Sequence, residues 1–400
     1  MILLKILPSN RTKNITYAIR DVVVEAKKLE KLGKKVIYLN IGDPLVYDFK
    51  TPQHMIDAVE NSWNKSSSYA DSMGLLEARQ AIARDAGRSK IQCTEDDVVL
   101  TSGGSEGISM ALGAIMNAGD NVLTPKPGYP LYNAVINYLE GKENEYELDE
   151  DNGWQPDIDD MRSKLNEKTK AIVLINPNNP TGGLYTKSML QKVVDLVGEH
   201  DLPIFSDETY DKIIFDDDFE FNAVAALSKD VPVVTFNTLS KNYLCPGWRV
   251  GWTIFSGDRE KIGEYDEAVK QLARARLSIS HPMQYAVKAA LDGPKDHLKE
   301  TVFKLKQRRD ITYKRLNEID GISCAKPRGA FYAFPKIDLP IKSDKEFILN
   351  LLREEGVLFV HGSGFGQKDG TNHFRVVFAA SEHALGEAYD KLENYVKKHY

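Results

Sequence analysis

The sequence predicts an α/β protein with a mostly parallel central sheet covered by helices, and a smaller α+β region after about residue 290. Two observations predict the sheet: short, strongly apolar runs recur along the chain, and helical patterns separate them. Strands of this kind are buried on both faces, as in parallel sheets between helix layers. The third observation is a change in the sequence pattern after about residue 290. A long charged helical segment is followed there by "GISCAKPRGAFYAFPKI" and "VLFVHGSGFG", which predict a smaller α+β region.

The N-terminal segment is expected to pack with the smaller region. Residues 17–33 carry apolar side chains at helical spacing, and the run "KVIYLNIGDP" that follows predicts a short strand in need of a partner sheet or a cleft. We therefore expect three regions: an N-terminal segment over 1–48, a large domain over 49–290 and a small C-terminal domain over 291–400.

Helices and strands alternate through the large region. Helices are expected near residues 75–88 and over 105–119, and further helical patterns fill several of the later gaps. The expected strands are "DVVLTSGG" (97–104), "NVLTP" (121–125), "KAIVLIN" (170–176), "LPIFSDE" (202–208), "VPVVTFN" (231–237) and "RVGWTIF" (249–255).

The composition argues against several classes of protein. The formal net charge is −6 and no basic block is present, so a nucleic-acid partner is not expected. No run of about 18 apolar residues predicts a membrane span, and no signal peptide is expected. The three cysteines, Cys93, Cys245 and Cys324, form no CxxC pair, and reduced thiols in a cytoplasmic protein are the simplest interpretation. The eight histidines are scattered without ligand spacing, so no metal site is expected.

Polar residues follow four of the expected strands, at the points where those strands end. They are Ser102 to Ser105, Asn176 to Gly182, Asp207 to Tyr210 and Thr238 to Lys241. Ligands of open α/β sheets bind outside the carboxyl ends of the strands. One such end would be unremarkable, but four together predict a site at one rim of the sheet.

Three of these motifs have a functional and a structural interpretation. The Gly103–Gly104 turn before Ser105 can hold a phosphate with backbone N–H groups, or it can be an ordinary capped turn. Asp207 ends a buried run, where a carboxylate is costly unless it meets a cation, although it can also cap the next turn. "NPNNPTGG" fixes its backbone with two prolines and presents Asn179, which is more constraint than a plain turn needs.

Three cations are further candidates. Lys241 follows a strand, and its amine becomes a nucleophile only when it is desolvated or placed beside positive charge, which Arg249 can supply. A solvated loop lysine is the structural alternative. Arg375 lies in the apolar run "HFRVVFAA", where a guanidinium must either bind an anionic ligand such as a carboxylate or form an internal ion pair.

Taken together, these motifs resemble those of the class I pyridoxal-phosphate-dependent aminotransferases, which have fold type I. The residues that carry the resemblance appear in the family's order and cover nearly the whole chain: "SYADSMGLLEAR", "TSGGSEGI", "PKPGYP", "NPNNPTG", "SDETY", "TLSKNYLCPGWRVGW" and "HFRVVFAA". Other segments, such as "KPRGAFYAFPKID", are most similar to the prokaryotic alanine aminotransferases. The resemblance implies pyridoxal 5'-phosphate as cofactor and the reaction of L-alanine with 2-oxoglutarate to give pyruvate and L-glutamate.

The resemblance also implies roles for individual residues. Lys241 would form a Schiff base with the cofactor and move a proton, and Asp207 would keep the ring nitrogen protonated. The other implied cofactor-binding residues are Gly103, Gly104, Ser105, Tyr129, Asn179, Tyr210, Thr238, Ser240 and Arg249, together with Tyr69, which would cross to the partner subunit of a homodimer. The implied substrate-binding residues are Gly42, Asn179, Arg375 and Arg20. Arg375 would bind the α-carboxylate, and Arg20, Arg274 or Arg276 the distal carboxylate.

Other functions remain open at this point. An aspartate, broad-specificity or aromatic aminotransferase would carry the same cofactor residues, and so would a fold type I lyase, because the pocket chooses which bond is broken. A DNA-binding regulator with an aminotransferase-like body is not expected, because only about 40 residues precede "NIGDP". The expected partners are therefore amino-acid and 2-oxo-acid substrates and a second copy of the chain, with no nucleic acid and no membrane.

Overall fold

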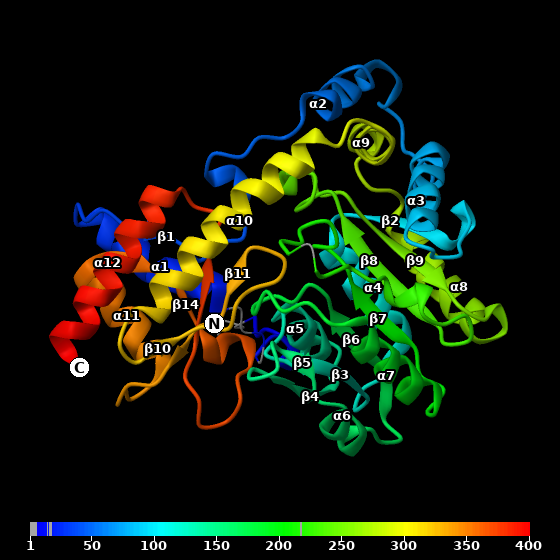
Figure 1. The fold of residues 1–400 in the computed structure, drawn as a ribbon. Coiled ribbons are helices and arrows are strands. Elements are labelled where there is room, and N and C mark those ends of the chain that lie inside the picture. Colours follow the sequence, from blue (N-terminus) through cyan, green and yellow to red (C-terminus); the bar gives the residue numbers. More distant parts are fainter. Residues whose placement is uncertain (1–5, 14, 16–17, 217) are drawn as a thin grey trace, which may run out of the picture.

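A large mixed sheet forms the centre of the larger of the two parts of the molecule (Figure 1). The computed structural model describes residues 6–13, 15, 18–216 and 218–400, and only the backbone of Arg20 and Asp21. Within these residues the large sheet has eight strands, in the order β2 (Val98–Thr101), β9 (Gly251–Ser256), β8 (Val233–Thr238), β7 (Ile204–Asp207), β6 (Thr169–Ile175), β3 (Asn121–Lys126), β4 (Lys142–Asp149) and β5 (Gln155–Pro156). Strands β9 and β5 run antiparallel to their neighbours and the other pairs are parallel, which confirms the predicted mostly parallel sheet.

Both faces of the sheet are buried at its central strands, and alternate side chains of these strands enter different cores. In β6, Ile172 and Leu174 belong to one buried cluster, whereas Val173 and Ile175 belong to the other. This alternation follows from the two-residue period of a strand, so a strand between two helix layers must be apolar at every position. The continuous apolar runs of the sequence have this physical origin.

Helices cover each face of the sheet. Helices α4 (Gly104–Ile115), α5 (Leu131–Tyr138) and α8 (Arg259–Arg276) supply buried residues to one core. The opposite core receives side chains from α2 (Gln53–Glu60), α3 (Leu76–Arg88), α6 (Ile158–Lys164), α7 (Lys187–Gly198) and α9 (His281–Asp292). None of the described helices combines the length and the apolar content that a membrane span requires.

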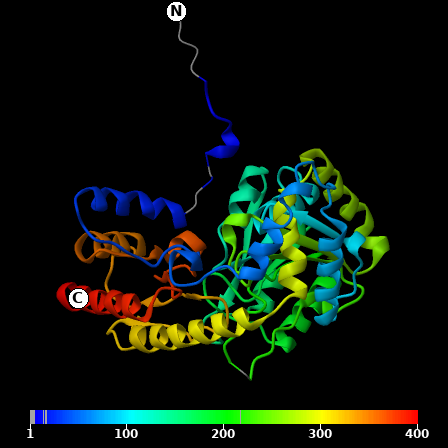
Figure 2. The ribbon, with the colours of Figure 1, turned by 90° about the horizontal axis from the view of Figure 1, so that it is seen from above.

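The smaller part of the molecule has short strands and long helices. Its strands are β10 (Ile322–Ser323), β11 (Tyr332–Ala333), β12 (Lys336–Ile337), β13 (Val357–Leu358), β14 (Val360–His361) and β15 (Phe374–Val377). Its helices are α10 (Asp296–Asn317), α11 (Asp344–Glu355) and α12 (Glu382–His399). Figure 2 shows α10, in yellow, running from the larger part along the smaller one.

The N-terminal segment joins the smaller part. Helix α1 (Ala18–Lys31) lies beside α11, and β1 (Ile37–Tyr38) pairs in parallel with β13. The strand expected over "KVIYLNIGDP" is therefore only two residues long, because beyond Tyr38 the chain turns into the cleft between the two parts. The domain boundaries given above stay a prediction.

Candidate active site

A cavity of about 450 Å³ lies at the carboxyl edge of the large sheet. The N-terminal segment and the strands β11 and β15 of the smaller part close its other side. The structure brings most of the sequence-predicted residues into its lining: Gly42, Gly104, Ser105, Tyr129, Asn179, Asp207, Tyr210, Thr238, Ser240, Lys241, Arg249 and Arg375. Because β9 is antiparallel to β8, Arg249 just before β9 reaches the same edge as Lys241 just after β8.

One end of the cavity is built to hold an anion. Gly103 caps the start of α4 with a positive φ of 73°, which a glycine adopts without strain. A Cβ on Gly103 would collide with the guanidinium of Arg249, which donates a hydrogen bond to Ser105 Oγ at 3.0 Å. The helix N-terminus, its exposed N–H groups and this guanidinium therefore converge on one point, as in phosphate sites.

Two hydroxyl groups complete this end. Thr238 donates its hydroxyl proton to the carbonyl of Val250 at 2.7 Å, and its oxygen lies 2.8 Å from Ser240 Oγ. A hydroxyl has a single hydrogen, so Ser240 donates to Thr238 in this arrangement, and a hydroxyl that binds an anion must turn its hydrogen toward that anion. The Thr238 contact also ties the end of β8 to the start of β9, which fixes Lys241 and Arg249 relative to each other.

Lys241 bridges the sheet edge and the N-terminal segment. Its ammonium group donates a hydrogen bond to the carbonyl oxygen of Gly42 at 2.5 Å. Gly42 leaves no room for a side chain, because a Cβ there would overlap the hydroxyl of Tyr332. A glycine is required at this position for that reason, and its carbonyl approaches the lysine closely.

Asp207 is a buried carboxylate that faces the cavity. It accepts hydrogen bonds from the Thr209 N–H at 3.2 Å and from the Tyr132 hydroxyl at 3.4 Å. Burial raises the pKa of Asp207, although these hydrogen bonds and the positive charge of Lys241 oppose the rise. Such long hydrogen bonds satisfy a buried anion poorly, so a cationic group in the cavity would be strongly bound here.

Tyr210 and Tyr332 meet inside the cavity. Their hydroxyl oxygens lie 2.7 Å apart, and the rings pack edge to face with centroids 5.5 Å apart. Burial raises the pKa of Tyr210 well above its ordinary value, which keeps this hydroxyl protonated and able to donate. Sequence analysis predicted Tyr210 but missed Tyr332 and Tyr132, since an aromatic residue in an apolar run gives no sign that its hydroxyl faces a site.

Arg375 is fully enclosed, with 1% of its surface exposed. Its guanidinium donates hydrogen bonds to Asn179 Oδ1 at 3.0 Å and to the carbonyl of Asn40 at 2.5 Å. The rings of Tyr332 and Phe365 flank it, with centroids 4.7 and 4.6 Å from Cζ. These contacts orient the guanidinium, and its planar fork of N–H donors matches the geometry of a carboxylate ligand.

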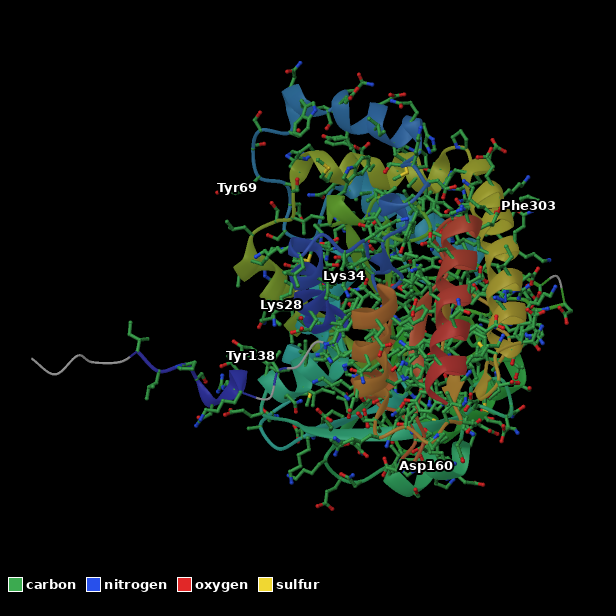
Figure 3. All side chains as sticks on the ribbon, turned by 90° about the vertical axis from the view of Figure 1, so that its left-hand side faces the viewer. Lys28, Lys34, Tyr69, Tyr138, Asp160 and Phe303 are labelled. Carbon is green, nitrogen blue, oxygen red and sulfur yellow. The ribbon has the colours of Figure 1, made fainter. Side chains whose placement is uncertain are left out.

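The remaining predicted residues lie elsewhere. Tyr69 is at the surface with 80% of its area exposed, pointing away from the molecule (Figure 3). Arg276 is held by Glu106 at 2.8 Å and by the Ser72 carbonyl at 2.8 Å, and Arg274 pairs with Glu267 on the surface. Neither of these two arginines lines the cavity. The side chain of Arg20 lies outside the described residues.

A second buried carboxyl group follows Asp207 directly. Glu208 accepts hydrogen bonds from the Ser206 hydroxyl at 2.9 Å and the Val224 N–H at 3.1 Å, on the side of the sheet away from the cavity. Burial raises the pKa of Glu208 from its ordinary value of 4.5 to about 8. The two neighbouring carboxyl groups thus have different surroundings, and Glu208 is expected to be protonated at neutral pH.

Comparison with known proteins identifies relatives along the whole chain. The family model for aminotransferase class I and II matches residues 34–392. A Haemophilus influenzae protein named glutamate-pyruvate aminotransferase AlaA is 41% identical over 396 residues, 97% of each chain. The Mycobacterium tuberculosis alanine aminotransferase is 38% identical over 97% of this chain and 92% of its own. A solved alanine aminotransferase from Pyrococcus furiosus superposes with a TM-score of 0.95 at 47% identity, covering 98% of this chain and 100% of its own.

The fold and the cavity define a pyridoxal-phosphate-dependent enzyme of fold type I. The family match and the relatives also agree on the type of reaction, which is the transfer of an amino group. The chain belongs to the class I and II aminotransferases and is an aminotransferase.

The residues present fit pyridoxal phosphate. The cavity combines an anion cradle at one end, a buried carboxylate at Asp207 for a cationic ring nitrogen, and an amine at Lys241 for an aldehyde. Gly104 has open space where a Cβ would stand, so a ligand can approach the start of α4 closely. The three groups have the charges and chemistry that this cofactor requires.

The Glu208→Gln variant tests the protonation of the second carboxyl group. Between pH 4.5 and about 8 the folded protein binds a proton at Glu208 that the unfolded chain has lost, so the free energy of unfolding should fall as pH rises through this window. Glutamine does not titrate, so denaturant unfolding should show a shallower fall for this variant than for the wild type. Glu300→Gln, at an exposed site on α10, is the matched control; equal pH slopes for the wild type and both variants would contradict the assignment.

Proposed function

We propose that this aminotransferase transfers the amino group of L-alanine to 2-oxoglutarate, giving pyruvate and L-glutamate. The observation that carries the proposal is the cavity in which Lys241, Asp207 and Arg375 meet at the sheet edge. The choice of substrates rests on the similarity to proteins named alanine or glutamate-pyruvate aminotransferase over nearly the full length of both chains. Aspartate is the alternative donor that the experiment below must exclude.

In the proposed reaction Lys241 transfers a proton and Arg375 binds the substrate. Bound pyridoxal phosphate supplies an aldehyde that bonds to amines and a ring that withdraws electrons from the substrate's α-carbon. Lys241 Nζ would take the proton from that α-carbon and deliver it to the cofactor carbon that carried the aldehyde. Arg375 binds the α-carboxylate and so directs the α-hydrogen toward the lysine.

The cofactor-binding residues hold the ring and phosphate in a fixed position. Asp207 pairs with the protonated ring nitrogen, and that cation relieves the desolvation of the carboxylate. Tyr210 and Asn179 donate to the ring oxygen, while Tyr129 packs on the ring. The phosphate is bound by the groups at the start of α4 and the end of β8: Gly103, Gly104, Ser105, Thr238, Ser240 and Arg249.

The substrate side chain is proposed to extend toward the N-terminal segment. Ile19 and Ile41 line this part of the cavity and offer apolar surface to a methyl group. Among the described lining residues the basic groups are Lys241, Arg249 and Arg375, and the proposal already assigns each of them. Arg20, next to Ile19 in sequence, is therefore the proposed partner of the distal carboxylate of glutamate, with Gly42 assisting at the α-carboxylate.

A homodimer is proposed on the basis of an exposed apolar surface. Tyr69 is exposed on a loop whose carbonyl at Ser68 contacts His281 Nδ1 at 2.8 Å. Leu277, close to His281 in sequence, is also more than half exposed. A second copy covering this surface would bring Tyr69 toward the phosphate of the neighbouring site. The cytoplasmic location stays a prediction.

Replacement of Lys241 tests the central assignment. The purified protein should carry the visible absorbance of bound cofactor, and L-alanine should bleach it until pyruvate is added. Lys241→Ala should lower the transamination rate by about 10²- to 10⁴-fold, because it removes the proton-transferring group, whereas Lys187→Ala at an exposed site on α7 should not.

Two outcomes of the same experiment would reject the substrate proposal. Faster bleaching by L-aspartate than by L-alanine at equal concentration would identify an aspartate aminotransferase. If L-alanine fails to bleach the absorbance, release of ammonia and pyruvate from L-serine without any 2-oxo acid would identify a lyase, because serine carries the β-leaving group that alanine lacks.

The Arg20→Leu variant tests the distal carboxylate site. A lost charge-assisted hydrogen bond of about 1.5–3 kcal/mol should raise KM for 2-oxoglutarate roughly 10- to 100-fold. KM for pyruvate should change far less, because pyruvate has no distal carboxylate. Lys27→Leu, an exposed cation on the same helix, is the control; a parallel rise in both KM values for Arg20→Leu would assign this arginine another role.

The Tyr69→Phe variant tests the shared site. If Tyr69 donates to the phosphate of the neighbouring subunit, its loss should weaken cofactor binding by about tenfold without dissociating the dimer. Tyr138→Phe, at another exposed tyrosine (Figure 3), should leave cofactor affinity unchanged. Sedimentation as an active monomer would overturn the dimer proposal.

A further inference from the structure

Tyr332 touches more functional groups than its place in an apolar strand suggests. It lies on β11, 2% exposed, with its hydroxyl 2.7 Å from that of Tyr210. The face of its ring lies under the guanidinium of Arg375, with the centroid 4.7 Å from Cζ. The hydroxyl also packs against Gly42, whose carbonyl accepts the hydrogen bond of Lys241.

We propose that Tyr332 is a positioning residue with two separable functions. Its hydroxyl donates to Tyr210 and strengthens the hydrogen bond that Tyr210 gives to the cofactor, and its ring orients Arg375 for the substrate carboxylate. This inference rests on the roles of Tyr210 and Arg375 in the proposed function.

The direction of the hydroxyl bond follows from a count of hydrogens. Each tyrosine has one O–H, and Tyr210 uses its own when it donates to the ring oxygen of the cofactor. The oxygen of Tyr210 is then an acceptor, so the hydrogen between the two tyrosines comes from Tyr332. Hydrogen bonds in a chain polarise one another, and Tyr210 becomes a stronger donor. A stronger donor stabilises the deprotonated form of the cofactor oxygen.

The ring of Tyr332 acts on a different group. It packs against the Arg375 guanidinium, and so does the ring of Phe365, with its centroid 4.6 Å from Cζ. Two aromatic faces leave the guanidinium little freedom to rotate about its plane. A carboxylate binds bidentately only when that plane is fixed, so the ring prepares the substrate site before binding.

Packing alone would require the ring but not the hydroxyl. Phenylalanine would fill the same space on β11 and would keep the contact with Arg375. The hydroxyl and the ring can therefore be removed one at a time, by Tyr332→Phe and by Tyr332→Leu. A purely structural tyrosine would show neither of the two specific effects predicted below.

The experiment measures two quantities for each variant: the pKa of the visible band of bound pyridoxal phosphate, from a pH titration, and KM for L-alanine. Tyr332→Phe should raise the pKa by about half to one unit and change KM less than about threefold. Tyr332→Leu should in addition raise KM for L-alanine about 5- to 30-fold, because the guanidinium loses its aromatic support. Tyr389→Phe is the control, since Tyr389 is also buried and its hydroxyl lies 2.8 Å from that of Thr312, away from the cavity.

The Tyr210→Phe variant separates failure of this inference from failure of the proposed site. If Tyr210→Phe raises the pKa and Tyr332→Phe does not, Tyr210 binds the cofactor and the role of Tyr332 is overturned. If neither variant changes the pKa of the visible band, the assignment of Tyr210 itself is wrong. If Tyr332→Leu fails to fold, Tyr332→Phe still decides the hydroxyl function, and unchanged KM in a folded Tyr332→Leu protein would overturn the ring function.

Discussion

The burial of a single carboxylate at the end of β7 is the constraint on which the site depends. Asp207 loses its hydration, and its hydrogen bonds with the Thr209 backbone, the Thr209 side chain and the Tyr132 hydroxyl compensate only partly. Glu208, the next residue, points to the other side of the sheet, where it accepts two shorter hydrogen bonds and burial raises its pKa. The two-residue period of a strand thus places a carboxylate that needs a cation beside a carboxyl group that does not. A ligand with a protonated ring nitrogen supplies what Asp207 lacks.

The N-terminal segment connects Lys241 and Arg375, the two cations that are proposed to act on the substrate. The carbonyl of Asn40 accepts a hydrogen bond from Arg375, and the carbonyl of Gly42 accepts one from Lys241. These two residues are on the same short stretch after β1, which itself is held by pairing with β13 of the smaller part. The lysine of the large sheet and the arginine of the smaller part are therefore positioned by one piece of backbone. A shift of either part relative to the other would change the distance between amine and carboxylate clamp.

The sequence predicted the large sheet and the residues at its rim because both leave a local signal. Doubly buried strands must be apolar throughout, and motifs such as the Gly103–Gly104 turn follow them directly. The length of β1 was not predictable, since it is limited by a partner more than 300 residues away, at Val357. Tyr332 and Tyr132 were missed because their hydroxyl partners, Tyr210 and Asp207, are brought to them only by tertiary folding. The sequence likewise could not show that Arg274 and Arg276 are already bound to neighbouring carboxylates.

Arg274 and Arg276 on α8 show how an existing ion pair keeps an arginine from binding a substrate. Arg276 is bound to Glu106, and Glu106 also accepts a hydrogen bond from the backbone N–H of Ser102 at 2.7 Å. The ion pair therefore helps to hold the turn that contains Gly103 and Gly104. Freeing Arg276 for a substrate would leave a partly buried carboxylate next to an anion site, which is strongly unfavourable. In the proposed function the distal carboxylate is therefore recognised from the wall that the N-terminal segment forms, where Ile19 and Ile41 line the cavity. A wall that is apolar near the α-carbon and basic further out would accept both substrates. The methyl group of alanine would contact only the apolar part, and the longer side chain of glutamate would place its carboxylate at the basic part.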